Sequence, residues 1–304
     1  MVHNTRERPM ISVITPVYNG GKFIESCIKV VIAQNCPEVE HIIIDGGSSD
    51  CTLDIIKEYA QKYPHIRWIS EKDRGQSDAM NKGICIAKGD ILGFLNADDF
   101  YEPDVLNQVL QNFKTLPEDT LLVGNCNVWN DNNTVKLVNR PEKLKLSQLL
   151  LGHRVNAFPI NPSAYFYHKS LHEKIGMYNA EDHYSMDVDF LFRAVQVANI
   201  KYIDKILGNY RQIEGTKTVN DLQSGQNKIR LECLYKKYRK DLPLLKRGYT
   251  YFLYTFYKVW FKIKYFIESP KRIIPSLKNK TTKSLKLVFY IKPKNIALSF
   301  KTRK

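Results

Sequence analysis

The sequence predicts an α/β protein in which one doubly wound, mostly parallel sheet is flanked by helices and followed by a helical, basic appendage. Two observations predict the sheet. Short apolar runs alternate with stretches of helical periodicity, and each of the first four runs ends in a polar cluster. The charge distribution predicts the appendage, because basic residues gather towards the C-terminus.

Four strands and the three helices between them are expected in the first third of the chain. The strands are expected at 11–16, 41–44, 66–69 and 90–96, and the helices at 20–33, 52–63 and 77–87. The next part is less regular, with β segments at 121–128 and 134–138 and helices at about 144–151 and 190–198. Hydrophobic residues make up 43% of the chain, which is enough for a large core. We expect a main domain at 1–215 and a tail at 216–304.

The formal net charge of +15 belongs to the tail. Residues 236–304 hold 20 Lys and Arg against two acids, which leaves 26 basic and 29 acidic residues before them. The main domain is therefore not expected to bind nucleic acid. The six cysteines include no C-x-x-C pair, so neither a zinc site nor a disulfide framework is expected, and a cytoplasmic location fits. Residues 1–10 carry charges and no apolar run, unlike a signal peptide or membrane anchor.

Each polar cluster follows directly after an expected strand. The carboxyl ends of parallel strands meet at one edge of a sheet, and ligands bind α/β sheets at that edge. One ligand site can therefore use all four clusters, which are Thr15 to Asn19, Asp45 to Asp50, Asp73 to Gln76 and Asp98-Asp99.

The acidic pair Asp98-Asp99 predicts a divalent-cation site. Hard cations such as Mg²⁺ or Mn²⁺ prefer a few carboxylate oxygens together with the phosphate oxygens of a nucleotide. We expect Asp99 to bind the metal and Asp98 to lie nearer the ribose hydroxyls. The alternative is that the pair caps the following helix.

Asp45 follows three consecutive isoleucines and is a candidate to accept hydrogen bonds from a base edge or a ribose. Gly46 and Gly47 allow a sharp turn after it. The alternative is a simple turn followed by a helix cap at Ser49 or Asp50.

Taken together and in this order, four stretches resemble the successive signatures of family 2 glycosyltransferases, over roughly residues 10 to 215. They are Val13 to Gly20 (VITPVYNG), Ile44 to Thr52 (IDGGSSDCT), Ser70 to Gly83 (SEKDRGQSDAMNKG) and Leu95 to Asp99 (LNADD). The resemblance implies the GT-A fold and transfer with inversion from a nucleotide-sugar, with donor binding at about 10–130 and the acceptor and base region at about 131–215.

The resemblance also implies roles for individual donor-site residues. Asp45 reads the base, and the stretch from Asn96 to Asp99 is the metal-binding motif, with Mg²⁺ or Mn²⁺ as cofactor. Asn81 and Lys82 are either donor contacts or structural residues. The remaining implied donor contacts are Thr15, Pro16 and Tyr18 on the nucleobase side, and Asp73 with Arg74 near the ribose or sugar.

The catalytic base is expected at the polar start of the helix that ends the acceptor region. The stretch from Ser185 to Arg193 resembles the Asp-x-Asp/Glu-Leu-x-x-Arg segment of relatives, and Asp187 aligns with their base, with Asp189 as the alternative. Both carboxylates could instead cap the helix. Arg211 is expected to hold the departing diphosphate or, equally, to form a surface ion pair.

The acceptor is expected to be a lipid-linked or surface-polysaccharide glycan. No Q-x-x-R-W motif of homopolymer-forming relatives occurs, which favours addition of one sugar per encounter. Asn161 to Ala164 stands where many relatives have His-Gln, so no acceptor identity is taken from them.

The tail is expected to dock on an anionic membrane surface through residues 236–304, at the inner face of the cell membrane. Its apolar stretch from Tyr249 to Ile267 is interrupted by Lys258, Lys262 and Lys264, so it is too short to span a bilayer. Aromatic rings mixed with lysines suit the headgroup layer. A basic helical appendage packed on protein is the first alternative, and single-stranded RNA binding is a more distant one.

Two other functions are alternatives to glycosyl transfer. A catalytically silent, nucleotide-sugar-binding scaffold would keep the fold but need no base. A Rossmann oxidoreductase is disfavoured, because no G-x-G-x-x-G follows the first strand. The sequence does not predict the oligomeric state.

Overall fold

The computed structural model describes residues 11–268 apart from residues 154 and 183. The chain forms two units, 1–255 and 256–304. The sequence expectations for residues 1–10, and those for 269–304 within the tail, lie outside the described residues.

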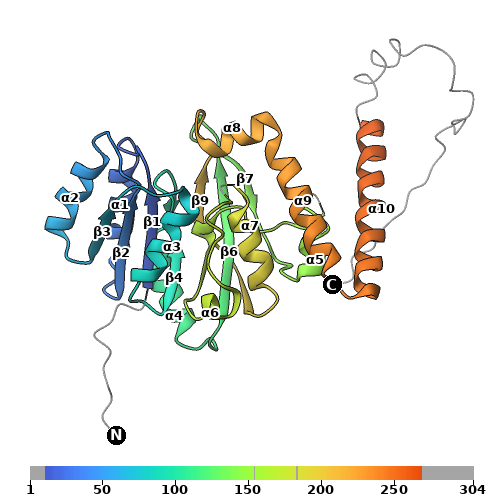
Figure 1. The fold of residues 1–304 in the computed structure, drawn as a ribbon, viewed down its shortest axis with the longest axis horizontal. Coiled ribbons are helices and arrows are strands. Elements are labelled where there is room, and N and C mark those ends of the chain that lie inside the picture. The colour runs from blue at the N-terminus through green and yellow to red at the C-terminus, as the bar shows by residue number, and fades with distance from the viewer. Residues whose placement is uncertain (1–10, 154, 183, 269–304) are drawn as a thin grey trace, which may run out of the picture. The chain divides into compact units, whose positions relative to one another are not determined.

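The described residues form a nine-stranded sheet in the order β3-β2-β1-β4-β8-β6-β9-β5, with β7 paired to β6 (Figure 1). β1 pairs parallel with β2 and β4, and β2 with β3, whereas β8 runs antiparallel between β4 and β6. Six strands therefore share one direction, and only β5, β7 and β8 oppose it. The strands are β1 Ile11–Val17, β2 Val39–Asp45, β3 Ile66–Ser70, β4 Ile91–Phe94, β5 Phe100–Tyr101, β6 Thr120–Trp129, β7 Val135–Asn139, β8 Tyr165–His168 and β9 Asn199–Arg211.

Helices connect the strands and flank the sheet, as the alternating sequence pattern predicts (Figure 1). The helices are α1 Ile24–Ala33, α2 Thr52–Lys62, α3 Gln76–Ile86, α4 Val105–Phe113, α5 Leu146–Leu149, α6 Leu171–Ile175, α7 Met186–Ala194, α8 Lys217–Ser224, α9 Gln226–Lys240 and α10 Leu244–Glu268, with a 3₁₀ turn at Pro162–Ala164.

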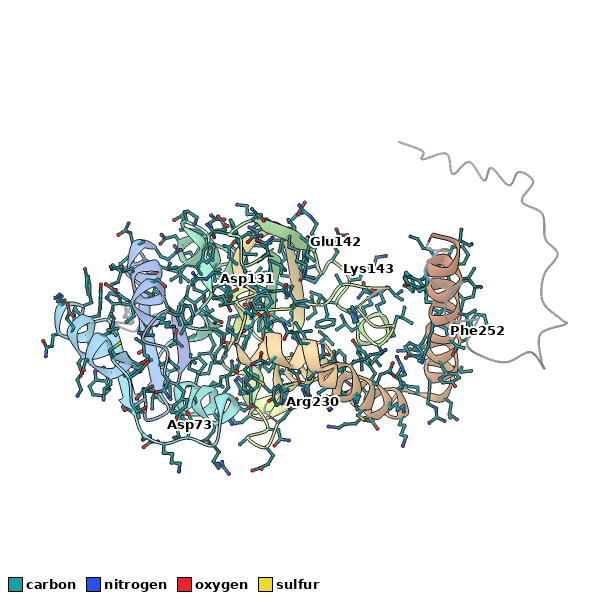
Figure 2. All side chains as sticks on the ribbon, turned by 90° about the horizontal axis from the view of Figure 1, so that it is seen from above. Asp73, Asp131, Glu142, Lys143, Arg230 and Phe252 are labelled. Atoms are coloured by element: carbon teal, nitrogen blue, oxygen red, sulfur yellow. The ribbon has the colours of Figure 1, made fainter. Side chains whose placement is uncertain are left out.

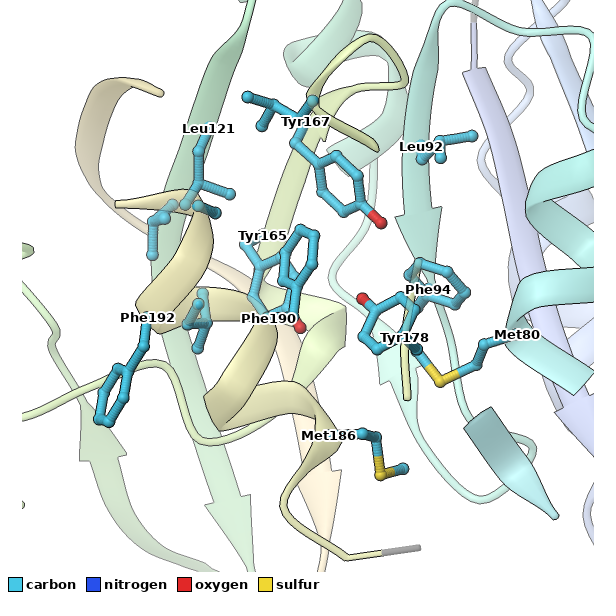
Figure 3. Packing of buried hydrophobic residues seen from close by; sticks show 14 of the residues in the cluster. Met80, Leu92, Phe94, Leu121, Tyr165, Tyr167, Tyr178, Met186, Phe190 and Phe192 are labelled. Carbon is cyan, nitrogen blue, oxygen red and sulfur yellow. The ribbon is translucent and has the colours of Figure 1, made fainter. Parts of the chain in front are cut away.

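An aromatic cluster fixes helix α7 against the sheet (Figure 3). Phe190 of α7 is fully buried, and its ring centroid lies 4.7 Å from that of Tyr167 and 5.1 Å from that of Tyr178. Tyr165 packs on the same ring at 6.2 Å. Because Phe190 is held on three sides, the rotation of α7 about its axis is set, and with it the directions of the polar residues in its first turn.

Two differences from the sequence expectation in the second half of the main unit concern helix α7 and the domain boundary. The helix expected at 190–198 is α7, which begins at Met186, because Asp182 folds the preceding loop by accepting hydrogen bonds from the backbone and hydroxyl of Ser185. The expected domain boundary after residue 215 also moves. Tyr235 and Tyr238 of α9 are buried in the main core, so the compact unit extends to Thr255.

Candidate active site

The four polar clusters meet at one edge of the sheet. The Asn19 backbone N–H donates to Ser48 Oγ at 2.7 Å, and Asn19 Oδ1 accepts from the Ser49 N–H at 2.9 Å, which joins the first two clusters. Gln76 joins the third cluster to the fourth, because its Nε2 donates to Asn96 Oδ1 at 3.0 Å. The loops after β1, β2, β3 and β4 therefore build one site.

A cleft of about 330 Å³ opens between the first three clusters, a size at the lower end for a small-molecule site. It is lined by Tyr18, Gly46, Gly47, Lys72 and Asp73. Tyr18 is 66% exposed, and a Cβ on Gly46 would lie only 2.6 Å from Asp73 Oδ2. An exposed ring beside bare glycine backbone suits a flat group such as a nucleobase.

The side chains of Asp45 and Thr15, both expected to contact the nucleobase, are instead hydrogen-bonded within the protein. The buried Asp45 carboxylate accepts from the Ser48 hydroxyl at 2.5 Å and from the Ser70 hydroxyl at 2.6 Å, so it shapes the floor of the loop beside the cleft. Thr15 is also buried, and its hydroxyl lies 2.9 Å from His41 Nε2. The Thr15 side chain therefore faces the interior rather than the cleft, while Tyr18 lines the cleft.

The third cluster links the cleft to the loop that precedes α7. Asp73 Oδ1 accepts from the Gly75 N–H at 2.8 Å, which leaves its other oxygen for a ligand. Arg74 is exposed and lies 3.8 Å from Glu181. Lys82 pairs with Glu71 at 2.7 Å, outside the cleft lining.

Helix α3 is joined to the same loop through partly buried hydrogen bonds. Ser77 Oγ donates to the Asp182 carbonyl at 2.6 Å. Asn81 uses its whole amide on Tyr178: Nδ2 donates to the backbone carbonyl at 2.8 Å, and Oδ1 accepts from the N–H at 3.0 Å. Of the two roles open for Asn81 in the sequence, the structure supports the structural one.

The two carboxylates of the acidic pair are treated differently. Asp99 is 1% exposed, and its Oδ2 accepts from Asn161 Nδ2 at 2.7 Å and from Asn96 Nδ2 at 2.9 Å. Its Oδ1 accepts from the Arg211 N–H at 3.0 Å. Burial, with the neighbouring charge of Asp98, raises the pKa of Asp99 to about 7.

Asp98 is only half-buried and receives no side-chain hydrogen bond within the described part of the chain. Burial raises the pKa of its carboxyl, and the positive charge of Arg211 opposes that rise. The Arg211 Nε donates to the Asp98 backbone carbonyl, and the guanidinium lies 5.6 Å from the Phe100 ring centroid. Arg211 is thus part of the site and not a surface ion pair.

These contacts test whether the acidic pair fits a divalent cation. Asp98 offers a reachable carboxylate, whereas both Asp99 oxygens already accept hydrogen bonds. Among residues 11–268, apart from 154 and 183, no group of three or more His, Cys, Asp or Glu side chains is placed to hold a metal. Such a site fits a cation that takes most of its ligands from substrate phosphates and water, as Mg²⁺ and Mn²⁺ do. Of the two residues, Asp98 has the carboxylate with fewer protein contacts, whereas the sequence expectation gave the metal to Asp99.

Asn161 is a site residue whose role was not predicted. It lies within the expected acceptor region, yet its amide reaches across to Asp99, while its Oδ1 accepts from the backbone and hydroxyl of Ser163. Its only sequence signal is the departure from the His-Gln of relatives.

Asp187 presents a carboxylate that the protein leaves unsatisfied. Its Oδ1 is buried and has no hydrogen-bond partner among the described residues. Burial, followed by the nearby charge of Asp182, raises the pKa of Asp187 to about 6, and Lys217 opposes that rise. A carboxylate with such a pKa is ionised at neutral pH and can accept a proton.

Asp189, two residues along the same helix, is fully occupied. Its Oδ2 accepts from Arg193 Nε at 2.8 Å, and its Oδ1 accepts from the Tyr238 hydroxyl at 2.9 Å. Lys237 lies 3.6 Å from the same carboxylate. Asp189 therefore joins α7 to α9, and of the two candidate bases only Asp187 is left for a substrate.

Lys217, at the start of α8, interacts electrostatically with Asp73 of the cleft and with Asp187 of α7. Desolvation lowers its pKa, although the residue reaches solvent, and the charges of Asp187, Asp182 and Asp73 act in the opposite direction. Its Nζ lies 4.6 Å from the centroid of the Tyr184 ring. Figure 2 marks Asp73 in the cleft and Arg230 on α9, whose guanidinium packs 4.0 Å from the same ring. Asp73 and Asp187 thus both interact electrostatically with one cation, Lys217.

Comparisons with known proteins agree with this architecture. The family model described as "Glycosyl transferase family 2" matches residues 12–176. The chain is 30% identical over 214 residues to a chondroitin synthase of Escherichia coli, and 30% identical over 216 residues to a chondroitin synthase of Pasteurella multocida. Each match spans 69% of this chain but only 30% and 21%, respectively, of those longer relatives.

Solved structures share the fold. The crystal structure of S. aureus TarS 1-349 in complex with UDP-GlcNAc superposes with a TM-score of 0.57 at 22% identity, covering 69% of this chain and 60% of TarS 1-349. The mannosyltransferase PcManGT from Pyrobaculum calidifontis, in complex with GDP-Man and Mn²⁺, gives a TM-score of 0.54 at 18% identity, covering 73% and 62%. The predicted GT-A fold is confirmed.

Proposed function

The chain belongs to glycosyl transferase family 2, and we propose that it transfers a monosaccharide from a nucleotide-sugar, in the first place a UDP-sugar, to a hydroxyl of a lipid-linked or surface-polysaccharide glycan. The transfer proceeds with inversion and adds one sugar per encounter. The binding of UDP-GlcNAc by TarS and of GDP-Man by PcManGT supports a nucleotide-sugar donor.

The observation that carries the proposal is the buried Oδ1 of Asp187, which has no hydrogen-bond partner among the described residues and interacts with the same cation, Lys217, as Asp73 of the cleft. Inversion requires a base that removes the proton of the acceptor hydroxyl on the face of the sugar opposite the leaving diphosphate. Asp187 accepts that proton at its carboxylate. A silent nucleotide-sugar-binding scaffold would not need a buried carboxylate without a partner, which costs stability.

The donor binds across the cleft and the acidic pair. Tyr18 packs on the nucleobase above Gly46 and Gly47, with Pro16 and the Asp45 loop beneath, and the free oxygen of Asp73 accepts from a hydroxyl of the ribose or sugar. Arg211, which already contacts the backbone of Asp98, donates to the diphosphate.

A divalent cation, Mg²⁺ or Mn²⁺, would be held by Asp98, with Asp99 fixing the position of the loop. When bound, the cation neutralises the charge that develops on the departing diphosphate. The side chains of the protein complete the site. Asn96 and Asn161 hold Asp99 by hydrogen bonds, and Arg211 neutralises part of the phosphate charge.

A two-step experiment tests the proposal. UDP-, GDP- and dTDP-sugars are screened for thermal stabilisation with and without Mg²⁺ or Mn²⁺, and the stabilising donor is then used in a transfer assay in which NMR reports the anomeric configuration of the product. We expect metal-dependent stabilisation and an inverted product. Retention of configuration, or stabilisation by no nucleotide-sugar, would contradict the proposal.

The variant Asp187→Asn separates binding from transfer in the same assay. It should be stabilised by the donor as the wild type is, because the cleft and Asp98 are untouched, yet lose nearly all of its transfer activity. Wild-type turnover would remove Asp187 from the mechanism.

A further inference from the structure

Helix α10 carries a continuous exposed apolar face. At 100° per residue, eight large side chains fall within an arc of about 100° along the helix. All of them are between 48% and 90% exposed. They are Leu245, Tyr249, Phe252, Phe256, Val259, Trp260, Ile263 and Ile267.

The opposite side of the first half of α10 is occupied by protein. Thr250 is 1% exposed, and the Tyr254 hydroxyl donates to Glu232 Oε1 of α9 at 2.7 Å. The Arg239 guanidinium lies 3.7 Å from the Tyr254 ring centroid. Packing on α9 therefore fixes which side of this half faces outward, and Phe252, marked on α10 in Figure 2, belongs to the outward face.

The charge of α10 indicates what covers this face. The helix contains five basic residues and one acid, Glu268. By helical position, Lys246 and Lys264 fall beside one edge of the apolar face. Lysines at the edge of a face of Trp, Phe and Tyr rings suit the headgroup layer of a bilayer, where rings partition at the interface and cations approach anionic lipids.

We propose that α10 docks in the plane of an anionic lipid bilayer through this apolar face. The helix lies on the membrane rather than across it, because no helix among the described residues is long and apolar enough to span one. The sequence expectation of membrane docking through residues 236–304 is thereby limited to the apolar face of α10. The proposal does not depend on the proposed reaction, because it uses no residue of the active site.

Flotation of the full chain with vesicles tests the proposal, using mixed phosphatidylcholine and phosphatidylglycerol vesicles against pure phosphatidylcholine. We expect recovery with the anionic vesicles that falls as salt is raised. The double variant Phe252→Ser/Trp260→Ser removes two aromatic rings from the face and should weaken binding roughly 10- to 100-fold. Equal recovery with neutral vesicles at all salt concentrations would overturn the anionic assignment.

A matched control exists on the same helix. Tyr251 and Tyr265 are 64% and 54% exposed, close to the 66% and 51% of Phe252 and Trp260, but lie off the apolar face. Tyr251→Ser/Tyr265→Ser should bind vesicles within about twofold of wild type, because its rings do not reach the bilayer. Equal loss in both double variants, or in neither, would overturn the proposal.

Trp260 also reports directly on the face. Its fluorescence should shift to the blue and be quenched by brominated lipid when vesicles are added, and thermal unfolding of each variant confirms that the main unit is intact. If light scattering instead shows a concentration-dependent dimer that Phe252→Ser/Trp260→Ser abolishes, with no quenching by lipid, the face is an interface between two copies and the membrane proposal fails.

Discussion

The site contains two pairs of aspartates, and in each pair one carboxylate is held by hydrogen bonds while the other is left with fewer partners. The groups that hold the first carboxylate differ between the pairs. In the pair after β4, Asp99 accepts three hydrogen bonds from neutral amide groups, while Asp98 receives none from a side chain. In the pair at the start of α7, Asp189 is held by the Arg193 guanidinium and a tyrosine hydroxyl, while Asp187 has a buried oxygen without a partner.

The difference between the two anchors has electrostatic consequences. Neutral amides do not balance a charge, so burial raises the pKa of Asp99 to about 7, and its charge is sensitive to whatever binds at Asp98. Asp189 is instead paired with a cation, the Arg193 guanidinium. In each pair, one carboxylate is held by hydrogen bonds within the protein, and the other is the one that the proposed function assigns to the ligand.

The largest expected effect separates Asp187 from Asp189. Asp187→Asn should lower transfer by about 10³-fold, within the range for losing a general base, while donor binding persists. Asp189→Asn should keep measurable transfer, because its carboxylate does not face the substrate. Initial rates under saturating donor provide the measurement, and greater inactivation by Asp189→Asn would invert the assignment.

The next effect separates Asp98 from Asp99. Asp98→Asn should weaken metal-dependent donor binding by about 10²-fold, since the carboxylate available to the cation is lost. Titration calorimetry with and without Mn²⁺ measures it. If Asp99→Asn abolishes the metal dependence while Asp98→Asn retains it, the order first expected from the sequence is restored.

Replacing either of the two carboxylates that are held by hydrogen bonds, Asp99 and Asp189, should lower the stability of the fold. Asp99→Asn turns an amide N–H towards the donors that now meet a carboxylate, and Asp189→Asn removes the partner of Arg193. Each should lower the free energy of unfolding by about 1–3 kcal/mol. Urea titration measures this, with Asp98→Asn as the control that should not be destabilised.

The smallest effect concerns pH. Because Asp187 must be ionised to accept a proton, kcat/KM should fall about tenfold per pH unit below a pKa of about 6.

The same group should make the stability of the fold depend on pH. The folded-state pKa of Asp187 lies above the ordinary value of 3.8, so its favourable contribution to the free energy of unfolding is complete below pH 3.8 and is lost as pH rises through about 6. Asp187→Asn should therefore be more stable than wild type above pH 6, on the order of 1–2 kcal/mol. Melting curves at pH 4 and pH 8 test the sign, since the gain should vanish at the lower pH.

The first half of the fold was predictable because three of its strands, β1, β2 and β4, are buried on both faces. The run around His41 to Ile44 and that from Ile11 to Pro16 read directly as strands, and the observed β2 and β1 exceed these bounds by two residues or fewer. β9 was not predicted, because its first residues are largely exposed and polar and its pairing with β6 is non-local.

The roles within each acidic pair could not be predicted from the sequence. Asp187 and Asp189 are two residues apart, so they point about 200° apart around the helix axis, and only the buried Phe190 decides which of them faces the substrate. The contact between Asn161 and Asp99 spans 62 positions of the chain. No local pattern encodes such a contact.

The hydrogen bonds from Ser77 and Asn81 of α3 to the loop before α7 have a consequence for protein engineering. They tie a helix of the donor half to the segment that presents Asp187. Chimeras that graft a foreign acceptor half onto this donor half would cut these contacts at any crossover between α3 and β8. A graft that also carries Ser77 and Asn81 with their matching loop is the one expected to keep base and donor in register.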